Sequence, residues 1–293
     1  MTLPRPDTEQ SRRHALRFTH PDRWPSLARF PVEPALVEEI IAQMFACGPG
    51  EVRALVADQH AEVTASAARL LLDVQYARDI AALPFRASDR VVVVGDSVSA
   101  DRLGWFELLT ASLTLARDDA VVMVNQSISG DTTASAIERI DLVAAAAPDH
   151  VLIMLGTNDA RRHGRGGTAR MVSPQETVRN LRELADVAVH DLGARPYVIT
   201  PPACDHDRIA TFFTGSAVCW NGDEVDAIID TVRALGPSVI DVASAMRAIP
   251  PEEFGALLEP DGIHPTVVGQ QLLARRVAAG LAAAAVPADP PGR

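Results

Sequence analysis

The stretch Val91-Val92-Val93-Val94-Gly95-Asp96-Ser97 places four consecutive valines directly before a glycine and two polar residues. A run of β-branched residues without polar alternation predicts a strand that is buried on both faces of a parallel sheet. Ser97 follows where this strand turns into a helix, so its hydroxyl is expected to be exposed beside a helix N-terminus, which favours negative charge. The alternative interpretation is that Asp96 or Ser97 only caps the helix.

Four further β-branched runs come later in the chain, each followed by a helical stretch or a turn. They lie at 121–124, 151–155, 197–200 and 239–242. Five buried strands separated by crossovers predict an α/β fold, with a five-stranded parallel sheet and helices on both faces. Because ligands of such sheets bind outside the carboxyl ends of the strands, functional residues are expected just after these runs.

Three later positions carry residues suited to chemistry. Gly130, after the second run, lets a backbone amide approach a ligand without a β-carbon in the way, and Asn158 follows the third run. Asp261 and His264 are three residues apart, so the carboxylate can orient a ring whose other nitrogen acts as a base. Each signal alone is more typical of a loop, a turn or a helix cap. Together with Ser97, and in this order, they are far more specific.

The four blocks resemble those of the SGNH hydrolases of the GDSL family. The resemblance covers residues 89–285 and implies a flavodoxin-like three-layer sandwich for that part of the chain. The matching residues are Ser97 in Gly-Asp-Ser, Gly130 in Ser-Gly-Asp-Thr, Asn158 in Gly-Thr-Asn-Asp, and Asp261 with His264 in Asp-Gly-Ile-His-Pro.

The resemblance also implies a catalytic triad and an oxyanion hole. Ser97 would attack an acyl carbonyl, His264 would take its proton and return it to the leaving group, and Asp261 would fix the imidazole tautomer. The Ser97 amide, the Gly130 amide and the Asn158 side chain would donate to the developing oxyanion. This mechanism needs no metal and no other cofactor. An α/β-hydrolase is disfavoured because no Gly-x-Ser-x-Gly sequence surrounds any serine.

The first 88 residues lie outside the resemblance. Residues 1–30 are polar and are expected to be irregular, whereas residues 31–88 show two apolar helical patterns, at 36–45 and 51–83. We expect a helical hairpin whose apolar stripe is buried either on the following domain or against a second copy of the chain, as in a homo-oligomer. Residues 286–293 are expected to form a flexible tail.

Composition excludes several classes of protein. All 27 cationic side chains are arginine, so mechanisms that need a lysine amine are excluded, among them Schiff-base, pyridoxal phosphate, Walker-type and Ser-Lys mechanisms. The net charge of -11 disfavours attraction to nucleic acid or anionic membranes, and no apolar run is long enough to span a bilayer. Three cysteines without CxxC spacing, and an N-terminus without a secretory apolar core, favour a cytoplasmic setting. A Cys204–Cys219 disulfide is expected only in an exported protein.

The loop after Asn158 is a candidate for substrate binding because it holds four arginines in an otherwise acidic domain. Arg161 and Arg162 come first in this loop and suit an anionic substrate such as a carboxylate or a phosphate. A solvated surface loop without contact to a substrate is the alternative interpretation.

A second candidate loop lies between the fourth and fifth predicted strands and contains Phe212, Phe213 and Trp220. These aromatic side chains can contact an acyl or aromatic group of a substrate, or they can pack the loop onto the sheet. Cys204 and His206 precede them, but their spacing matches no strong zinc pattern, so no metal site is predicted.

These observations predict a metal-independent carboxylic-ester hydrolase, of esterase or deacetylase type, that acts on a small-molecule ester. An acyltransferase or thioesterase with a carrier-bound or specialised-metabolite substrate would use the same triad, because only the acyl acceptor differs. A binding or assembly protein with a vestigial pocket is the third hypothesis, and the presence of all five motif residues disfavours it.

Overall fold

A four-stranded parallel sheet lies at the centre of the computed structural model, which describes residues 6–117 and 119–285. The strand order is β2-β1-β3-β6, and all three pairings are parallel. The α/β class predicted from the β-branched runs is therefore confirmed. The bounds of the strands are Arg90–Gly95 for β1, Val122–Asn125 for β2, His150–Met154 for β3 and Arg195–Ile199 for β6.

The prediction of a fifth strand at 239–242 is wrong. Ile240 forms one isolated parallel bridge to Ile199, and its N–H donates to the Val198 carbonyl over 2.9 Å. The ladder stops there because Asp241 caps helix α13, which begins at the next residue. A chain that has already turned into a helix cannot form the next rung of the sheet.

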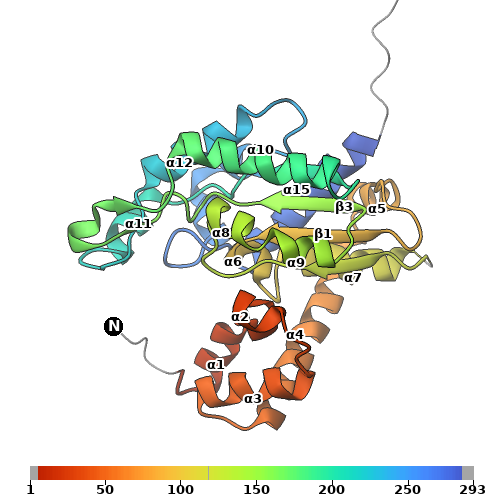
Figure 1. Ribbon diagram of the computed structural model, residues 1–293, viewed down its shortest axis with the longest axis horizontal. Helices are drawn as coiled ribbons and strands as arrows, with labels where there is room; N and C mark the ends of the chain where they lie inside the picture. Colours follow the sequence, from red (N-terminus) through yellow and green to blue (C-terminus); the bar gives the residue numbers. More distant parts are fainter. Residues whose placement is uncertain (1–5, 118, 286–293) are drawn as a thin grey trace, which may run out of the picture.

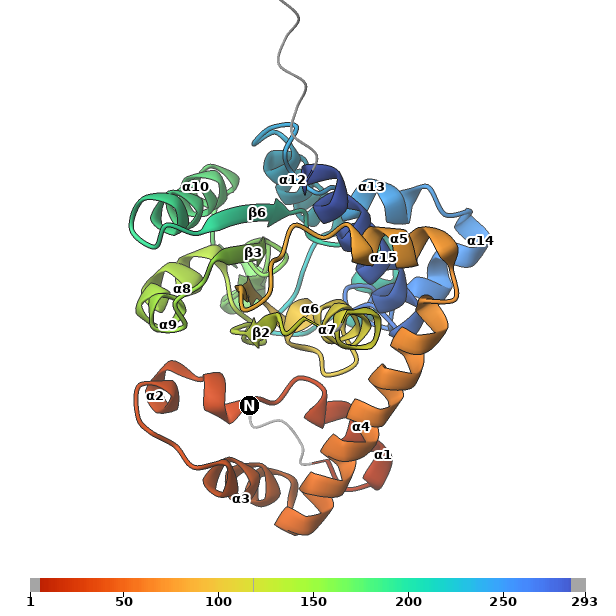
Figure 2. The same cartoon turned by 90° about the vertical axis from the view of Figure 1, so that its right-hand side faces the viewer.

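Helices flank the sheet on both sides (Figure 2). On one side lie α8 (Thr133–Glu138), α9 (Ile140–Ala145) and α10 (Pro174–His190), and on the other lie α7 (Trp105–Ala116) and α15 (Val267–Ala285). The central strands β1 and β3 are consequently buried almost throughout. The remaining elements of this part are α6 (Ser97–Ala100), β4 (Arg162–His163), η2 (Arg165–Gly167), β5 (Ala169–Arg170), α11 (His206–Phe212), α12 (Gly222–Arg233), α13 (Val242–Arg247), α14 (Pro251–Phe254) and η3 (Gly255–Leu257).

The N-terminal segment holds three short helices between residues 9 and 28, joined by turns, so the expectation that residues 1–30 are irregular is wrong for those helices. It contains α1 (Glu9–Leu16), η1 (Pro21–Arg23) and α2 (Pro25–Ala28). Helix α1 begins at a reciprocal capping box in which Thr8 and Ser11 exchange hydrogen bonds between side chain and backbone. Residues 1–5, and the predicted tail at 286–293, lie outside the described residues.

The predicted hairpin is a set of three helices, α3 (Pro34–Phe45), α4 (Pro49–Leu70) and α5 (Val74–Ala81). The chain turns by 101° between α3 and α4, and Asp73 caps α5, so the long helix predicted over 51–83 is broken. Helix α4 packs against α7 of the following domain, and α1 and α3 pack against α4 (Figures 1 and 2). A small second core fills this N-terminal part, formed by Leu16, Ile41, Ala42, Phe45, Val52 and Leu55.

Within the part of the chain that the structure describes, no single helix has both the length and the apolar character needed to cross a membrane. The bent pair α3 and α4 passes that test only when the two helices are counted together.

Candidate active site

Ser97 lies at the sharp turn between β1 and the short helix α6. Asp96 caps this helix, and its Oδ1 accepts the Val98 N–H over 3.0 Å. Gly95 is required just before the turn, because a β-carbon there would lie 2.6 Å from the Ser99 hydroxyl. The turn therefore fixes the Ser97 hydroxyl at the carboxyl end of the sheet, where the sequence predicted functional residues.

His264 connects Ser97 to Asp261. Its Nε2 is 2.9 Å from the Ser97 Oγ, and its Nδ1 is 2.5 Å from Asp261 Oδ2. The other carboxylate oxygen of Asp261 accepts the backbone N–H groups of Ile263 and His264, over 2.9 and 3.0 Å. The short turn holds the carboxylate against the imidazole, and the structure brings together the three residues named from the sequence.

The charges of this pair favour a proton on His264. Burial alone would lower the pKa of His264, but the hydrogen bond and charge of Asp261, with the charges of Asp96 and Asp101, raise it above its ordinary value. Burial would likewise raise the pKa of Asp261, and the contacts with His264 outweigh it, so that pKa is lowered. The pair is therefore suited to take a proton from Ser97 and to stabilise the resulting imidazolium.

Gly130 and Asn158 lie beside this group. Gly130 has a φ of 89°, which glycine adopts without strain. The Asn158 Nδ2 donates to the Asp131 carbonyl over 3.0 Å and is 3.5 Å from Asp96 Oδ2. Ser97, Gly130, Asn158, Asp261 and His264 all line one pocket of about 680 Å³.

The buried carboxylate of Asp159 anchors the loop that carries Asn158. Asp159 is fully buried and accepts hydrogen bonds from the Thr133 N–H and hydroxyl, over 2.8 and 2.6 Å, and from the Thr177 hydroxyl over 2.6 Å. These bonds tie the loop after β3 to helices α8 and α10. The position of Asn158 is thus set by the packing of the domain.

The structure separates the two arginines that the sequence treated together. Arg161 lines the pocket, with its Nη1 3.4 Å from Asn158 Oδ1 and its guanidinium 5.9 Å from the Trp220 ring centroid. Arg162 does not line it, because Arg162 Nε donates to Glu224 over 2.7 Å on helix α12. Burial lowers the pKa of Arg161 from its ordinary value, while the charges of nearby buried carboxylates act in the opposite direction.

The predicted aromatic residues divide in a similar way. Phe212 and Trp220 line the pocket, and Trp220 Nε1 donates to the Thr157 carbonyl over 2.9 Å. Phe213 is not among the lining residues. Its ring packs between the other two, with centroids 5.0 Å from Phe212 and 4.9 Å from Trp220, so it supports the pocket wall from behind.

Among the lining residues that the sequence did not indicate, His14 and Phe18 come from the N-terminal segment. The Phe18 ring is 5.4 Å from the His264 ring, centroid to centroid. Their only local signal is the start of helix α1 at Thr8, and nothing in the sequence near 14–18 points to residues 259–264. Glu259, Ile263 and Thr157 also line the pocket.

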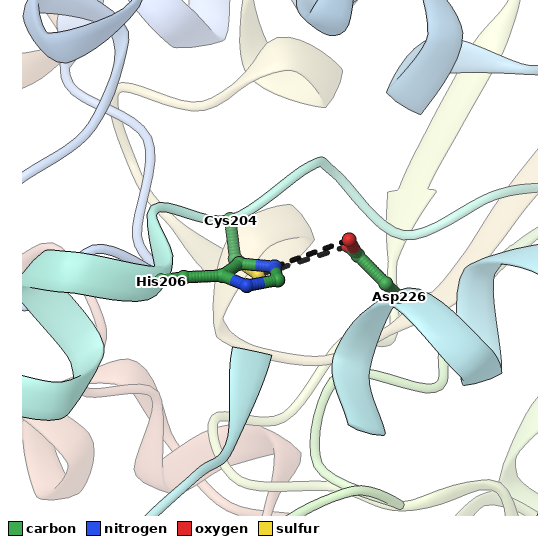
Figure 3. A group of neighbouring side chains, drawn as sticks. All are labelled: Cys204, His206 and Asp226. Atoms are coloured by element: carbon green, nitrogen blue, oxygen red, sulfur yellow. Dashed lines mark hydrogen bonds and ion pairs between the residues drawn. The ribbon is translucent and has the colours of Figure 1, made fainter. Parts of the chain in front are cut away.

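Cys204, His206 and Asp226 form a cluster whose potential ligand atoms lie within 4.8 Å of one another (Figure 3). His206 Nε2 is 3.1 Å from Asp226 Oδ2, and Arg247 already neutralises the same carboxylate over 2.6 Å. Burial raises the pKa of the Cys204 thiol to about 12, so a metal would have to displace a tightly held proton. The donor set therefore fits an ion-pair network better than a metal site. Cys204 and Cys219 are both free.

Two known proteins with sequences similar to this chain are esterases. The chain is 28% identical over 200 residues to Esterase TesA of Pseudomonas aeruginosa, covering 65% of this chain and 87% of the relative. It is 41% identical over 83 residues to an Arylesterase of Vibrio mimicus, but this match covers 26% of this chain and only 41% of the relative.

Solved structures show the same fold. A lipase/acylhydrolase from Enterococcus faecalis superposes with a TM-score of 0.55 at 23% identity, covering 69% of this chain and 100% of that one. The acetylxylan esterase Axe2 from Geobacillus stearothermophilus superposes with a TM-score of 0.51 at 20% identity, covering 67% and 94%. The model of the GDSL-like Lipase/Acylhydrolase family matches residues 93–272, more than half of the sequence, and the chain therefore belongs to that family.

Proposed function

We propose that this chain is a serine-dependent carboxylic-ester hydrolase. The observation that carries the proposal is the continuous line of contacts from Asp261 through His264 to Ser97, 2.5 and 2.9 Å long, which opens into the pocket. Membership of the GDSL-like family and the esterases among the relatives support the same reaction class.

The reaction has two halves. Ser97 Oγ forms a bond to the ester carbonyl carbon while its proton passes to His264 Nε2. The bond to the alcohol oxygen then breaks, and the alcohol leaves with the proton from His264. Water repeats the sequence on the acyl-enzyme, with His264 again as base and then as acid, and releases the carboxylic acid and free Ser97.

Three donors would stabilise the negative charge on the carbonyl oxygen in each half: the Ser97 and Gly130 amides and the Asn158 side chain. Each such donor typically contributes about a hundredfold to a thousandfold to turnover. The bond from one Asn158 N–H to the Asp131 carbonyl holds this side chain in place, so it needs no reorganisation during the reaction. Its second N–H has only the long 3.5 Å contact with Asp96 and is the one that would donate to the oxyanion. Phe212 and Trp220 line the same pocket and would contact the acyl or alcohol group.

Covalent trapping tests the nucleophile. An alkyl fluorophosphonate should add one phosphonyl mass to the peptide that contains Ser97, and Ser97→Ala should both remain unlabelled and fail to hydrolyse 4-nitrophenyl acetate. Far-ultraviolet circular dichroism should show that the variant is folded. Labelling of another serine, or full activity of Ser97→Ala, would refute the assignment.

Product analysis separates hydrolysis from transfer of the acyl group. Mass spectrometry of reactions with and without an added alcohol should find the free acid as the main acyl product in both. A transferred ester as the main product would favour an acyltransferase instead.

A further inference from the structure

Arg161 is the only arginine among the residues that line the active-site pocket. The pocket's acidic residues already have partners, since Glu259 pairs with Arg17 over 3.0 Å and Asp261 contacts His264. Arg161 forms no ion pair within 4.0 Å with any described residue, and its buried Nε has no hydrogen-bond partner among them. Among the described residues, the one hydrogen bond of its guanidinium is the long contact from Nη1 to Asn158 Oδ1, 3.4 Å.

A half-buried guanidinium that no described carboxylate approaches within 4.0 Å is suited to an anionic group supplied by a ligand. Its five donors match the two oxygens of a carboxylate in a fork geometry. A single arginine suits a single carboxylate. Arg161 Nη1 lies 3.2 Å from the point that a β-carbon on Gly130 would occupy. Because the Gly130 amide is a proposed oxyanion donor, Arg161 would lie next to the reacting carbonyl.

Resting on the proposed function, we propose that the physiological substrate is an ester that carries a carboxylate, and that Arg161 binds this group. Arg162 is the matched control, because it adjoins Arg161 in sequence but pairs with Glu224 outside the pocket.

Paired substrates of equal shape test this inference. One pair is 4-acetoxybenzoate and 4-acetoxybenzamide, with the charge on the leaving group, and the other is monomethyl succinate and methyl succinamate, with the charge on the acyl group. In Arg161→Gln, the ratio of kcat/KM for carboxylate over carboxamide should fall by about tenfold to a hundredfold in at least one pair, as expected for loss of a charged hydrogen bond. In Arg162→Gln the ratio should stay within about twofold of wild type.

An equal loss on both members of both pairs would overturn the inference and would mean that Arg161 acts on the oxyanion. In that case the proposed function would stand, because wild type would still hydrolyse the esters and Ser97→Ala would not. Failure of wild type to hydrolyse any ester would instead refute the proposed function, and this inference with it.

A separate set of contacts concerns residues 14–20, which lie before the family match that begins at residue 93. Arg17 binds Asp101, just after the Ser97 helix, through Nε over 3.0 Å and Nη2 over 2.6 Å. Its Nη1 binds Glu259 over 3.0 Å, and the Glu259 N–H donates to the His264 carbonyl over 2.7 Å. The third loop is held as well, because the Ser129 hydroxyl, adjacent to Gly130, donates to the Phe18 carbonyl over 2.8 Å.

One short segment thus contacts the three loops that carry Ser97, Gly130 and His264. We infer that residues 14–20 complete the active site, with Arg17 as a positioning residue for the His264 loop. Phe18 acts as a wall that limits the size of the bound ester. This second inference also rests on the proposed function.

Glu259→Gln tests the positioning role, because it weakens the link to Arg17 but keeps the buried Arg17–Asp101 pair. We expect kcat to fall about tenfold while KM changes little, and the acid limb of the pH profile to move to lower pH as the Asp261–His264 contact loosens. Glu259→Asp should restore part of the loss. Glu51→Gln is the control, because Glu51 pairs with Arg12 and neither residue lines the pocket. Its kcat, KM and pH profile should match those of wild type.

If Glu259→Gln has the kinetics and pH profile of Glu51→Gln, Arg17 has no positioning role. For the wall, Phe18→Ala should raise the ratio of kcat/KM for 4-nitrophenyl octanoate over acetate by about tenfold. An unchanged ratio would show that Phe18 does not limit ester size. Fluorophosphonate labelling of Ser97 in the same variants keeps either failure distinct from a failure of the proposed function.

Discussion

Arg17 and Asp101, 84 residues apart in the chain, form a buried ion pair with two hydrogen bonds, and their side chains are only 7% and 0% exposed. This pair joins the N-terminal segment to the end of the helix that begins with Ser97. Asp101 also accepts a hydrogen bond from Gln270 of α15 over 3.2 Å. The buried carboxylate of Asp101 therefore connects the N-terminal segment with helices α6 and α15 of the following domain.

Arg17→Met should destabilise the protein by about 3 kcal/mol or more, because it leaves the Asp101 charge buried without its partner. Arg12→Met is the control, since the Arg12–Glu51 pair is 18% and 37% exposed and should contribute less than about 1 kcal/mol. Urea unfolding followed by circular dichroism measures both. Equal losses in the two variants would mean that burial of the Arg17 pair does not matter for stability.

The positions of Ser97, Asp261 and His264 in the fold, which the structure confirms, depend on local signals. Four valines before a turn are enough to indicate a central strand with Ser97 at its end. The turn from Asp261 to His264 is closed by local hydrogen bonds, because the backbone N–H groups of Ile263 and His264 donate to the Asp261 carboxylate. The fifth strand failed for a local reason too, because the cap at Asp241 starts a helix before a ladder can extend.

The remaining parts depend on contacts between distant segments, which no local pattern encodes. Arg161 and Arg162 adjoin in sequence, yet only Arg162 meets Glu224, because it bridges to Cys219 near the start of α12. In the same way, Phe18 and His264 are neighbours because the N-terminal segment packs on loops of the following domain, where Arg17 pairs with Asp101 and Glu259. The sequence therefore predicted substrate binding for both arginines and gave no indication of Phe18.

Asn158→Ala should lower kcat by about a hundredfold to a thousandfold and change KM far less, because an oxyanion donor acts mainly in the transition state. Steady-state kinetics with 4-nitrophenyl acetate measure the two constants. A loss in Asn158→Ala that lies in KM alone would remove Asn158 from the oxyanion hole.

Asp96→Asn should stabilise the protein increasingly as the pH rises. Burial raises the pKa of Asp96 to about 7, against the opposing effects of the Val98 N–H and the His264 charge. The folded state therefore holds this proton more tightly than the unfolded state, so the contribution to stability is full below about pH 4 and is lost as the pH rises through about 7. Asparagine keeps an acceptor for Val98 and carries no charge.

The difference in unfolding free energy between Asp96→Asn and wild type should consequently grow by roughly 1.4 kcal/mol per pH unit between about pH 5 and 7. Urea titrations at several pH values measure this slope. A difference that stays constant with pH would show that Asp96 does not titrate in this range.

The activity of wild type should fall at acid pH because His264 must be neutral to accept the Ser97 proton. The pKa of His264 is raised above 6.5, so the acid limb of kcat/KM should lie above that pH, and kcat/KM should fall about tenfold per pH unit below the limb.

Asp96 is one of the charges that raise the pKa of His264. Asp96→Asn should therefore move the acid limb to lower pH. If the limb instead reported ionisation of the Asp96 carboxyl, it would disappear in this variant, because asparagine does not titrate. NMR titration of the His264 ring in Ser97→Ala supplies the microscopic value, and a limb that does not follow that titration would assign the pH dependence to another group.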